Sequence, residues 1–235
     1  MQPNKKREQI PLLDGKSFTV WRSDPVGPVK GGIVVLHAVY GLTDHIGDVC
    51  ARWAGAGYAA VAPALYDRHK PNVVHPYSRA GADAGIECYA ALTKDDIFSF
   101  IRACAKSLGN VGGVALSGFC TGGTWCWRAC AELDLTAQVN FYGSHVPAFI
   151  DLKPRCPTIM HYGDSDTIVP VGEVERIKAS HPNVAVHIYP GAGHAFFNPE
   201  QTTHDEAAAD LAWQRSLAFM EKHVASSKRV PGLCA

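Results

Sequence analysis

A cysteine in a glycine-flanked pentapeptide is the side chain whose setting most clearly indicates chemistry. The sequence around Cys120 has the form Gly-Phe-Cys-Thr-Gly, which is typical of a sharp strand-to-helix turn that presents a nucleophile. Residues 111–117 before it form a short apolar run expected for a buried strand, and residues 121–133 after it indicate a helix. Such a turn strains the nucleophile's backbone and needs small neighbours, here Gly118 and Gly122. We therefore expect a nucleophile rather than the alternative, an inert core thiol.

Two further candidates for chemistry follow later apolar runs. Asp166 comes after the strand-like residues 158–162, and His194 lies in a glycine-rich loop after residues 184–189. Nucleophile, acid and histidine therefore occur in the chain order that distinguishes α/β-hydrolase folds from other folds with such triads. The order itself supports the three assignments.

Both of these assignments have alternatives in the sequence. Asp164 competes with Asp166, and either carboxylate is also a candidate cap for the following helix. We favour Asp166 because the loop must leave its strand before it can reach a histidine. His194 competes with ten other histidines, among them His37 and His161, which lie inside expected strands and suit the core. We favour His194 because its glycine-rich loop can place the ring freely.

The residue types at these positions suit hydrolysis through a covalent intermediate. A histidine partner and the N-terminus of the following helix both favour the thiolate of Cys120, the form that attacks a carbonyl carbon. Asp166 would orient His194, and His194 would protonate the leaving oxygen and then activate water to cleave the thioester. For the oxyanion we expect two backbone N–H donors, at Thr121 and, from its position after the first long strand, at Val39.

These side chains require a scaffold in which strands and helices alternate. We expect strands at residues 33–38, 58–62, 111–117, 137–142, 158–162 and 184–189, and helices at residues 44–57, 83–108, 121–133, 171–180 and 205–224. Alternation of this kind predicts an α/β fold with a mainly parallel sheet and helices on both faces. In such sheets functional groups gather at the carboxyl ends of strands, where all three candidates fall.

Length and composition favour a single domain spanning residues 1–235. A chain of 235 residues, 47% of them hydrophobic, suits one core, and no linker-like or repeated segment divides it. The formal net charge is zero and the basic residues are dispersed, apart from a small cluster at residues 5–7, so neither a nucleic-acid nor a membrane partner is indicated. No apolar run reaches membrane-span length and residues 1–9 do not resemble a signal peptide. We expect a cytoplasmic monomer or small homo-oligomer.

The eight cysteines raise the question of disulfides or metal. Without an export signal we expect most to be reduced and to pack as small hydrophobic side chains. Cys126 and Cys130 would share a helix face, which also suits zinc, but no C-x-x-C pair or matching Cys/His pair accompanies them. We therefore expect no metal site, and we expect Cys234 to lie in a tail.

Together these stretches resemble the dienelactone hydrolase family, a cysteine-using branch of the α/β-hydrolases that opens cyclic enol-lactones to dicarboxylic acids. The resemblance covers about residues 31–224 and includes residues 40–42, 57–58, 62–68, 118–123, 163–166 and 191–196. It implies an α/β-hydrolase fold without a large cap domain, a triad of Cys120, Asp166 and His194, and no cofactor.

One departure from the family pattern concerns the activation of the thiol. Family members that act on dienelactone usually carry a glutamate just before the oxyanion-hole residue, where this chain has Ala38. The helper carboxylate is therefore absent or differently built. His37 is one residue away, and we interpret it as structural, similar to the histidines that brace this loop in other α/β-hydrolases.

Another departure concerns the substrate carboxylate, which the family tends to hold with an arginine shortly after the histidine. Phe197 and Asn198 stand there instead. Arg79 and Arg68 are candidates for that contact, with a solvated loop position as the alternative for each. The expected substrate-binding residues are Tyr40, Arg79, Phe196 and Asn198.

The leading hypothesis is a hydrolase of the dienelactone hydrolase type that cleaves a small lactone or carboxylic ester through a Cys120 thioester. An alternative is a broader esterase or thioesterase on neutral or aromatic esters. A different class, a non-catalytic binding protein with the same fold, would have no need of an oriented acid–histidine pair.

Overall fold

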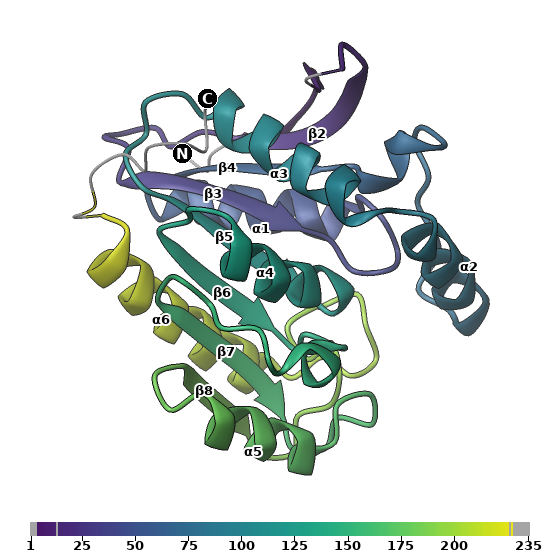
Figure 1. Cartoon of the computed structure of the whole chain (residues 1–235), viewed down its shortest axis with the longest axis vertical. Coiled ribbons are helices and arrows are strands. Elements are labelled where there is room, and N and C mark those ends of the chain that lie inside the picture. The colour runs from purple at the N-terminus through teal and green to yellow at the C-terminus, as the bar shows by residue number, and fades with distance from the viewer. Residues whose placement is uncertain (1–3, 13, 226, 228–235) are drawn as a thin grey trace.

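The central element of the fold is one sheet of eight strands. A computed structural model describes residues 4–12, 14–225 and 227 (Figure 1). The strand order in the described chain is β1-β2-β4-β3-β5-β6-β7-β8. β2 is antiparallel to both of its neighbours, β1 and β4, whereas strands β3 to β8 run parallel to one another. The strands are β1 (Lys6–Pro11), β2 (Ser17–Ser23), β3 (Gly31–Leu36), β4 (Tyr58–Pro63), β5 (Val114–Phe119), β6 (Ala137–Phe141), β7 (Thr158–Gly163) and β8 (Ala185–Tyr189).

Helices cover both faces of this sheet, as the alternation of elements predicts. In Figure 1, α1 and α6 lie behind the sheet, whereas α3 and α4 lie in front of it. The helices are α1 (Asp44–Gly55), α2 (Arg79–Ala90), α3 (Lys94–Ser107), α4 (Thr121–Glu132), α5 (Val171–Ser180) and α6 (Glu206–His223), and two 3₁₀ helices span Leu65–Arg68 and Val146–Phe149. The expected α/β architecture is confirmed.

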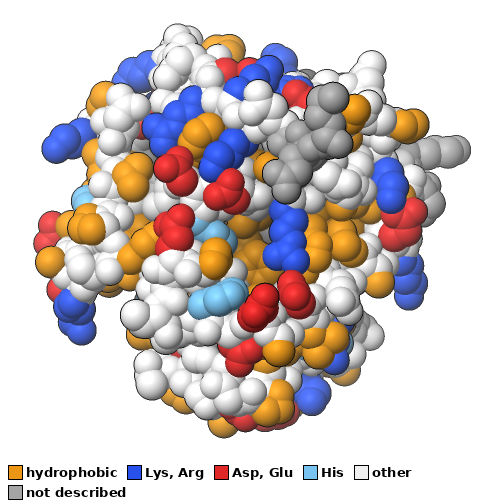
Figure 2. Space-filling view, turned by 180° about the vertical axis from the view of Figure 1, so that it is seen from behind, with side chains coloured by type: hydrophobic (Ala, Val, Ile, Leu, Met, Phe, Trp, Pro, Cys, Tyr) orange, Lys and Arg blue, Asp and Glu red, His pale blue; other side chains and the backbone are white. Residues whose placement is uncertain are grey.

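Charges of both signs are mixed on the surface that Figure 2 shows from behind. Lys and Arg side chains stand among Asp and Glu side chains, with hydrophobic side chains between them. This mixing agrees with a formal net charge of zero.

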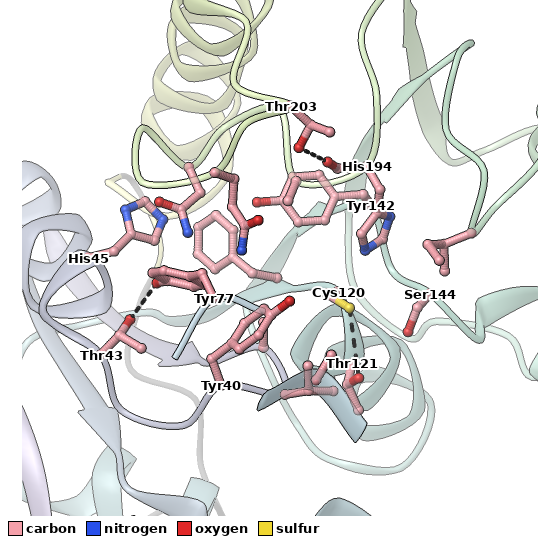
Figure 3. Close-up of a pocket in the computed structure, with 18 of the residues that line it drawn as sticks. Tyr40, Thr43, His45, Tyr77, Cys120, Thr121, Tyr142, Ser144, His194 and Thr203 are labelled. Carbon is pink, nitrogen blue, oxygen red and sulfur yellow. Dashed lines mark hydrogen bonds between the residues drawn. The ribbon is translucent and has the colours of Figure 1, made fainter. Parts of the chain in front are cut away.

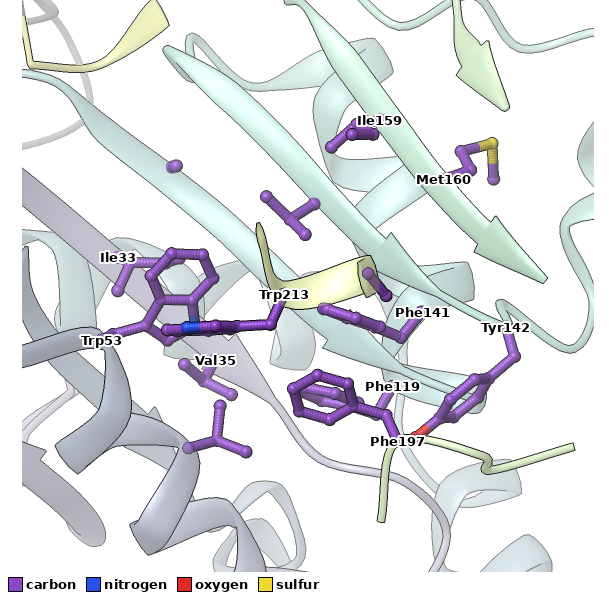
Figure 4. Packing of buried hydrophobic residues seen from close by; sticks show 14 of the residues in the cluster. Ile33, Val35, Trp53, Phe119, Phe141, Tyr142, Ile159, Met160, Phe197 and Trp213 are labelled. Atoms are coloured by element: carbon purple, nitrogen blue, oxygen red, sulfur yellow. The ribbon is translucent and has the colours of Figure 1, made fainter. Parts of the chain in front are cut away.

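An aromatic cluster packs beneath the carboxyl ends of the central strands (Figure 4). Phe119 ends β5 and is paired in register with Phe141 of β6, so their rings lie on the same face and stack with centroids 4.8 Å apart. Phe197 packs on both rings. The ring centroids of Trp213 in α6 and Trp53 in α1 lie 4.3 Å apart. The backbone just before Cys120 is therefore anchored in a tightly packed core.

One expected helix, residues 83–108, is wrong, because the structure divides this segment into α2 and α3. Thr93 begins α3 with a capping box: its hydroxyl accepts from the Asp96 N–H, and the Asp96 carboxylate accepts from the Thr93 N–H. These reciprocal bonds satisfy the first free N–H groups of a new helix. The Thr-x-x-Asp signal was present in the sequence.

The N-terminal strands β1 and β2 are also absent from the sequence-based prediction. β1 has mixed polar and apolar residues and is largely exposed, since it is the edge strand of the sheet. The elbow strand begins at Val114 rather than at residue 111, because Gly112 adopts a positive φ of 83° just before it.

Candidate active site

The structure brings the three predicted side chains together at the carboxyl ends of β5, β7 and β8. Figure 3 shows two of them, Cys120 and His194, at the cavity. Cys120 stands between β5 and α4 with φ 53° and ψ −117°, a conformation that costs a non-glycine residue about 1–3 kcal/mol. A side chain at Gly118 would collide with the Gly122 carbonyl, and one at Gly122 would collide with the Leu36 carbonyl. The two glycines are therefore needed for the close packing of α4 on the sheet.

Asp166, and not Asp164, is the carboxylate that holds His194. Its Oδ2 lies 2.7 Å from Nδ1 of His194, and its side chain is fully buried. Its Oδ1 accepts from the N–H groups of Ile168 and Val169 at 2.7 and 2.9 Å. Asp164 instead accepts from the Gly191 N–H at 2.7 Å and ties the two loops together.

The imidazole of His194 and the thiol of Cys120 favour each other's charged forms. Burial alone would lower the pKa of His194, but the Cys120 thiolate and the Asp166 carboxylate beside it raise this pKa to about 10. Burial opposes ionisation of Cys120, yet His194 and the hydroxyls of Thr121 and Ser144 lower the pKa of the thiol. Nε2 of His194 is buried without a hydrogen bond to any described group and faces the sulfur. The arrangement therefore favours a thiolate–imidazolium pair.

The loop after β3 contains a peptide group whose orientation is fixed by hydrogen bonds. The Ala38 carbonyl accepts from Nδ1 of His37 at 2.7 Å and from the Gly41 N–H at 3.2 Å. The described peptides are trans, so the Val39 N–H of the same peptide points away from that carbonyl. Val39 and Thr121 both line the cavity. Two hydrogen bonds thus fix the orientation of the predicted oxyanion donor.

His37 itself is a neutral histidine with a defined tautomer. Its Nε2 accepts from the Leu65 N–H at 3.2 Å, so the ring proton lies on Nδ1, where it is donated to Ala38. Burial lowers the pKa of His37 to about 4. The residue has the bracing position that the sequence suggested, at the base of the loop and away from the cavity lining.

Two tyrosines that sequence reasoning missed complete this brace. The Tyr89 hydroxyl donates to the His37 carbonyl, and the Tyr66 hydroxyl donates to the Val39 carbonyl at 2.8 Å. Gly85 of α2 lies so close to the Val39 carbonyl that a side chain there would collide with it. Tyr66 lies in segment 62–68, which resembles the family, and this resemblance could have predicted its role. No sequence feature indicated the role of Tyr89.

A cavity of about 320 Å³ opens above Cys120. Tyr40, Tyr77, Phe119 and Tyr142 supply its aromatic walls. No Lys, Arg, Asp or Glu side chain is among the residues that line it in the described part of the chain. Apart from Cys120 and His194, its hydrogen-bonding side chains include Thr43, His45, Ser144, Asn198, Gln201 and Thr203.

The structure brings Tyr40 and Asn198 to this cavity but keeps Arg79 and Phe196 away from it. The Arg79 side chain is 90% exposed and pairs with Asp83 at 3.0 Å. Phe196 is fully buried, because the positive φ of 63° at Ala195 turns it into the core against Tyr142 and Tyr189.

Arg68, the other arginine considered, is also occupied elsewhere. It pairs with Asp14 at 2.7 Å and with Asp96 at 2.6 Å. Neither arginine is therefore in place to hold a substrate carboxylate in this cavity. The expected carboxylate contact at Arg79 does not form.

Ser144 is a further residue that sequence reasoning missed. Its N–H donates to the Cys120 carbonyl at 3.2 Å, and its hydroxyl lies 2.9 Å from Nδ1 of His145. It follows the carboxyl end of β6. The three other residues were selected because they too follow the carboxyl ends of strands. Applying that rule to every strand would have found it.

Among the described residues, no cluster of three or more His, Cys, Asp or Glu side chains is arranged to hold a metal ion. Seven cysteines are free in the described residues, and Cys234 lies outside them. No helix in the described part of the chain combines the length and apolar character that a membrane span requires.

The chain matches known proteins along most of its length. The model of the dienelactone hydrolase family matches residues 18–224. A Synechocystis protein named "Putative carboxymethylenebutenolidase" is 30% identical over 202 residues, which cover 78% of this chain and 82% of the relative. A protein of the same name from Salmonella typhimurium is 30% identical over 219 residues, which cover 86% of this chain and 79% of the relative.

Solved structures agree with these sequence relationships. The crystal structure named "Putative Dienelactone Hydrolase" from Klebsiella pneumoniae superposes with a TM-score of 0.81 at 26% identity, covering 94% of this chain and 99% of that one. A dienelactone hydrolase-like promiscuous phosphotriesterase from metagenomic libraries has the same fold, with a TM-score of 0.75 at 19% identity over 93% of this chain and 98% of its own. The protein therefore has the α/β-hydrolase fold and belongs to the dienelactone hydrolase family.

Proposed function

We propose that this hydrolase cleaves a carboxylic ester or lactone with Cys120 as the nucleophile and a thioester as the intermediate. The observation that carries the proposal is the alignment of Cys120, His194 and Asp166 at the base of a cavity. The curated relatives named as carboxymethylenebutenolidases support an ester or lactone substrate.

The reaction begins with attack of the Cys120 thiolate on the carbonyl carbon. The negative charge moves to the carbonyl oxygen, which the N–H groups of Val39 and Thr121 stabilise. When the tetrahedral intermediate collapses, the C–O bond to the leaving oxygen breaks and Nε2 of His194 supplies its proton. The products of this half-reaction are an alcohol, or the opened hydroxyl end of a lactone, and a thioester on Cys120.

Hydrolysis of the thioester uses the same groups in reverse. Neutral His194 takes a proton from water, and the resulting hydroxide attacks the thioester carbonyl. The C–S bond then breaks, the carboxylic acid leaves, and Cys120 returns as a thiolate beside the imidazolium of His194. Asp166 holds Nδ1 of His194 throughout, so Nε2 always points toward the sulfur.

This pair explains how the thiol is activated without the family's usual glutamate. Ala38 offers no carboxylate, whereas the charge of His194 and the hydroxyls of Thr121 and Ser144 lower the pKa of Cys120. The thiolate in this proposal exists before the substrate binds.

A second candidate, an esterase for neutral or aromatic esters, is favoured by a cavity lining without Lys, Arg, Asp or Glu among the described residues. A substrate carboxylate would lose its hydration there without gaining a cationic partner, which is costly. Aromatic walls at Tyr40, Tyr77 and Phe119 suit a flat, uncharged group.

The experiment that tests the proposal is alkylation with iodoacetamide followed by peptide mass mapping. At pH 7, Cys120 should react first and hydrolysis of phenyl acetate should be lost in proportion. Burial raises the pKa of the comparison thiols Cys50, Cys104, Cys126 and Cys130. Acid quenching during turnover should trap an acyl group on Cys120.

Cys120→Ser is the matched variant, since it retains the geometry of the turn but removes the thiolate. Equal labelling of the five thiols, or an acyl group trapped elsewhere, would refute the nucleophile assignment. Binding of phenyl acetate without any hydrolysis would favour the non-catalytic binding protein.

A further inference from the structure

One end of the cavity contains buried polar side chains that have no role in the reaction just described. His45, at the start of α1, is 7% exposed, and Asn198, in the loop before α6, is 5% exposed. Both line the cavity together with Tyr77. In Figure 3, His45 and Tyr77 stand on the far side of the aromatic side chains from Cys120.

His45 is the residue with an unused hydrogen-bonding atom. Its Nε2 is buried and has no hydrogen-bond partner among the described residues. A buried polar atom left without a partner costs about 1–3 kcal/mol, so such atoms in native structures usually have a function. Burial lowers the pKa of His45 to about 4, so the ring is uncharged near neutral pH.

The neighbouring side chains form a hydrogen-bonded network, and the Glu200 carboxylate also lies within hydrogen-bonding reach of the Tyr77 hydroxyl. The Tyr77 hydroxyl donates to the Thr43 hydroxyl at 3.0 Å, and the Asn198 side chain is within hydrogen-bonding reach of Tyr77. Oδ1 of Asn198 accepts from the Glu200 N–H at 2.9 Å, which leaves its NH₂ group as the donor toward the other side. Tyr77 also packs edge to face on Tyr40, with ring centroids 4.6 Å apart.

The chemistry of these groups selects one kind of substituent. The Nε2 of a neutral histidine donates in one tautomer and accepts in the other, and a hydroxyl can pair with either. A hydroxyl can also donate to the Tyr77 oxygen while it pairs with His45. A carboxylate only accepts, and no Lys or Arg side chain lines the cavity in the described chain.

We propose that His45, Tyr77 and Asn198 form a recognition site for a hydroxyl group of the substrate, distant from the ester bond. The preferred substrates are then uncharged aryl-containing esters or lactones with a hydroxyl on the part that reaches this end of the cavity. The inference rests on the proposed function and adds the substrate class to it.

Two series of esters test this inference without changing the reactivity of the ester. One contains methyl phenylpropanoate and its hydroxy and carboxy analogues, with the ring substituent meta or para. The other contains phenethyl acetate with the same substituents, so that either part of the substrate can reach His45. In one series, the hydroxy analogue should exceed the unsubstituted ester about fivefold in kcat/KM, as one added hydrogen bond predicts. The carboxy analogue should be at least about tenfold poorer than the hydroxy analogue.

His45→Phe retains an aromatic ring beside Phe119 and Phe197 but removes both nitrogens. It should abolish the hydroxyl preference, measured within the variant as the ratio of kcat/KM for the hydroxy ester to that for the unsubstituted ester. His223→Phe is the matched control, because His223 packs on Phe219 of α6 and does not line the cavity. Tyr77→Phe should reduce the preference at least about twofold, and it decides the matter if His45→Phe does not fold.

Three results would overturn the recognition site: equal rates for hydroxy and unsubstituted esters in both series, a preference that persists in His45→Phe and Tyr77→Phe, or faster turnover of the carboxy analogue. In each case, hydrolysis of the unsubstituted ester through Cys120 would leave the proposed function standing. Failure of the wild-type protein to hydrolyse any ester would instead reject the proposed function.

Discussion

His37 and His194 are both largely buried histidines in loops that border one cavity, yet their pKa values move in opposite directions. Burial lowers the pKa of His37 to about 4, and the opposing effects of the hydrogen bond to Ala38 and of the Asp67 charge are smaller. His194 is buried as well, but the Cys120 thiolate and the Asp166 carboxylate raise its pKa to about 10. Burial removes water from both rings, and the neighbouring anions decide which ring carries charge.

The two loops accordingly contribute different components of one site. The loop after β3 holds a backbone donor in place with neutral hydrogen bonds that do not change near neutral pH. The loop after β8 holds a proton that can move. Stabilisation of developing charge requires fixed groups, whereas proton transfer requires a titratable one.

Asp166→Asn should have the largest effect, because it removes a carboxylate that helps to raise the pKa of His194 above that of His37. We expect kcat to fall about 10⁴-fold, since the wrong tautomer of His194 then competes. The pKa of His194, measured by NMR, should fall. Asp164→Asn is the matched control in the same loop and should keep most of the activity. Full activity in Asp166→Asn would mean that the carboxylate does not orient the base.

His37→Phe should have the next largest effect. It keeps an aromatic ring against Tyr66 and Tyr89 but frees the Ala38–Val39 peptide, so kcat should fall about 10²-fold while iodoacetamide labels Cys120 at an unchanged rate.

His161→Phe serves as the control for stability alone. His161 is equally buried and binds the hydroxyls of Tyr189 and Ser216 away from the cavity lining. Each variant should lose about 1–3 kcal/mol of unfolding free energy in urea, because buried partners are left unsatisfied. An equal loss of kcat in both would show that His37 acts only through general stability.

A change of pH near neutrality should have the smallest effect. We expect kcat/KM to be nearly constant there and to fall at both acid and alkaline pH. The imidazolium of His194 donates to the leaving oxygen, so activity should decline as pH rises through about 10, tenfold per unit. On the acid side, activity should be lost as the lowered pKa of Cys120 is crossed and the thiolate is protonated.

Protonation of His37 near pH 4 would also cost activity, because its Nε2 could no longer accept from Leu65. The rate of iodoacetamide labelling distinguishes protonation of Cys120 from protonation of His37, because this rate depends on the charge of Cys120 alone. An alkaline limb near pH 6.5 would contradict the difference between the two histidines.

The sequence was most informative where local pattern and chain order act together. Short apolar runs located the parallel strands, and Cys120, Asp166 and His194 were selected because each follows such a run; the structure brings them together, and their catalytic roles stay a prediction. It was less informative for contacts between distant segments. Nothing local shows that Ala195 turns Phe196 into the core.

Side-chain direction and long-range pairing account for the other differences. Arg79 lies in the expected part of the chain, but it begins α2 and pairs with Asp83 one helical turn later. The edge strand β1 depends on pairing with β2 across a turn, and its polar residues gave little apolar periodicity. Helix and strand propensities predict neither the direction of the Arg79 side chain nor the pairing of β1 with β2.

The capping box at Thr93 separates a helix that supports the fold from a helix that shapes the cavity. α3 buries eight residues against the sheet, whereas α2 buries only Gly81, Gly85 and Tyr89 while its Ala82 and Ile86 line the cavity. Substitutions of Ala82 and Ile86 should therefore change which substrates the proposed site accepts at little cost to folding. Variation along α2 would then alter the substrate preference while the proposed reacting groups stay the same.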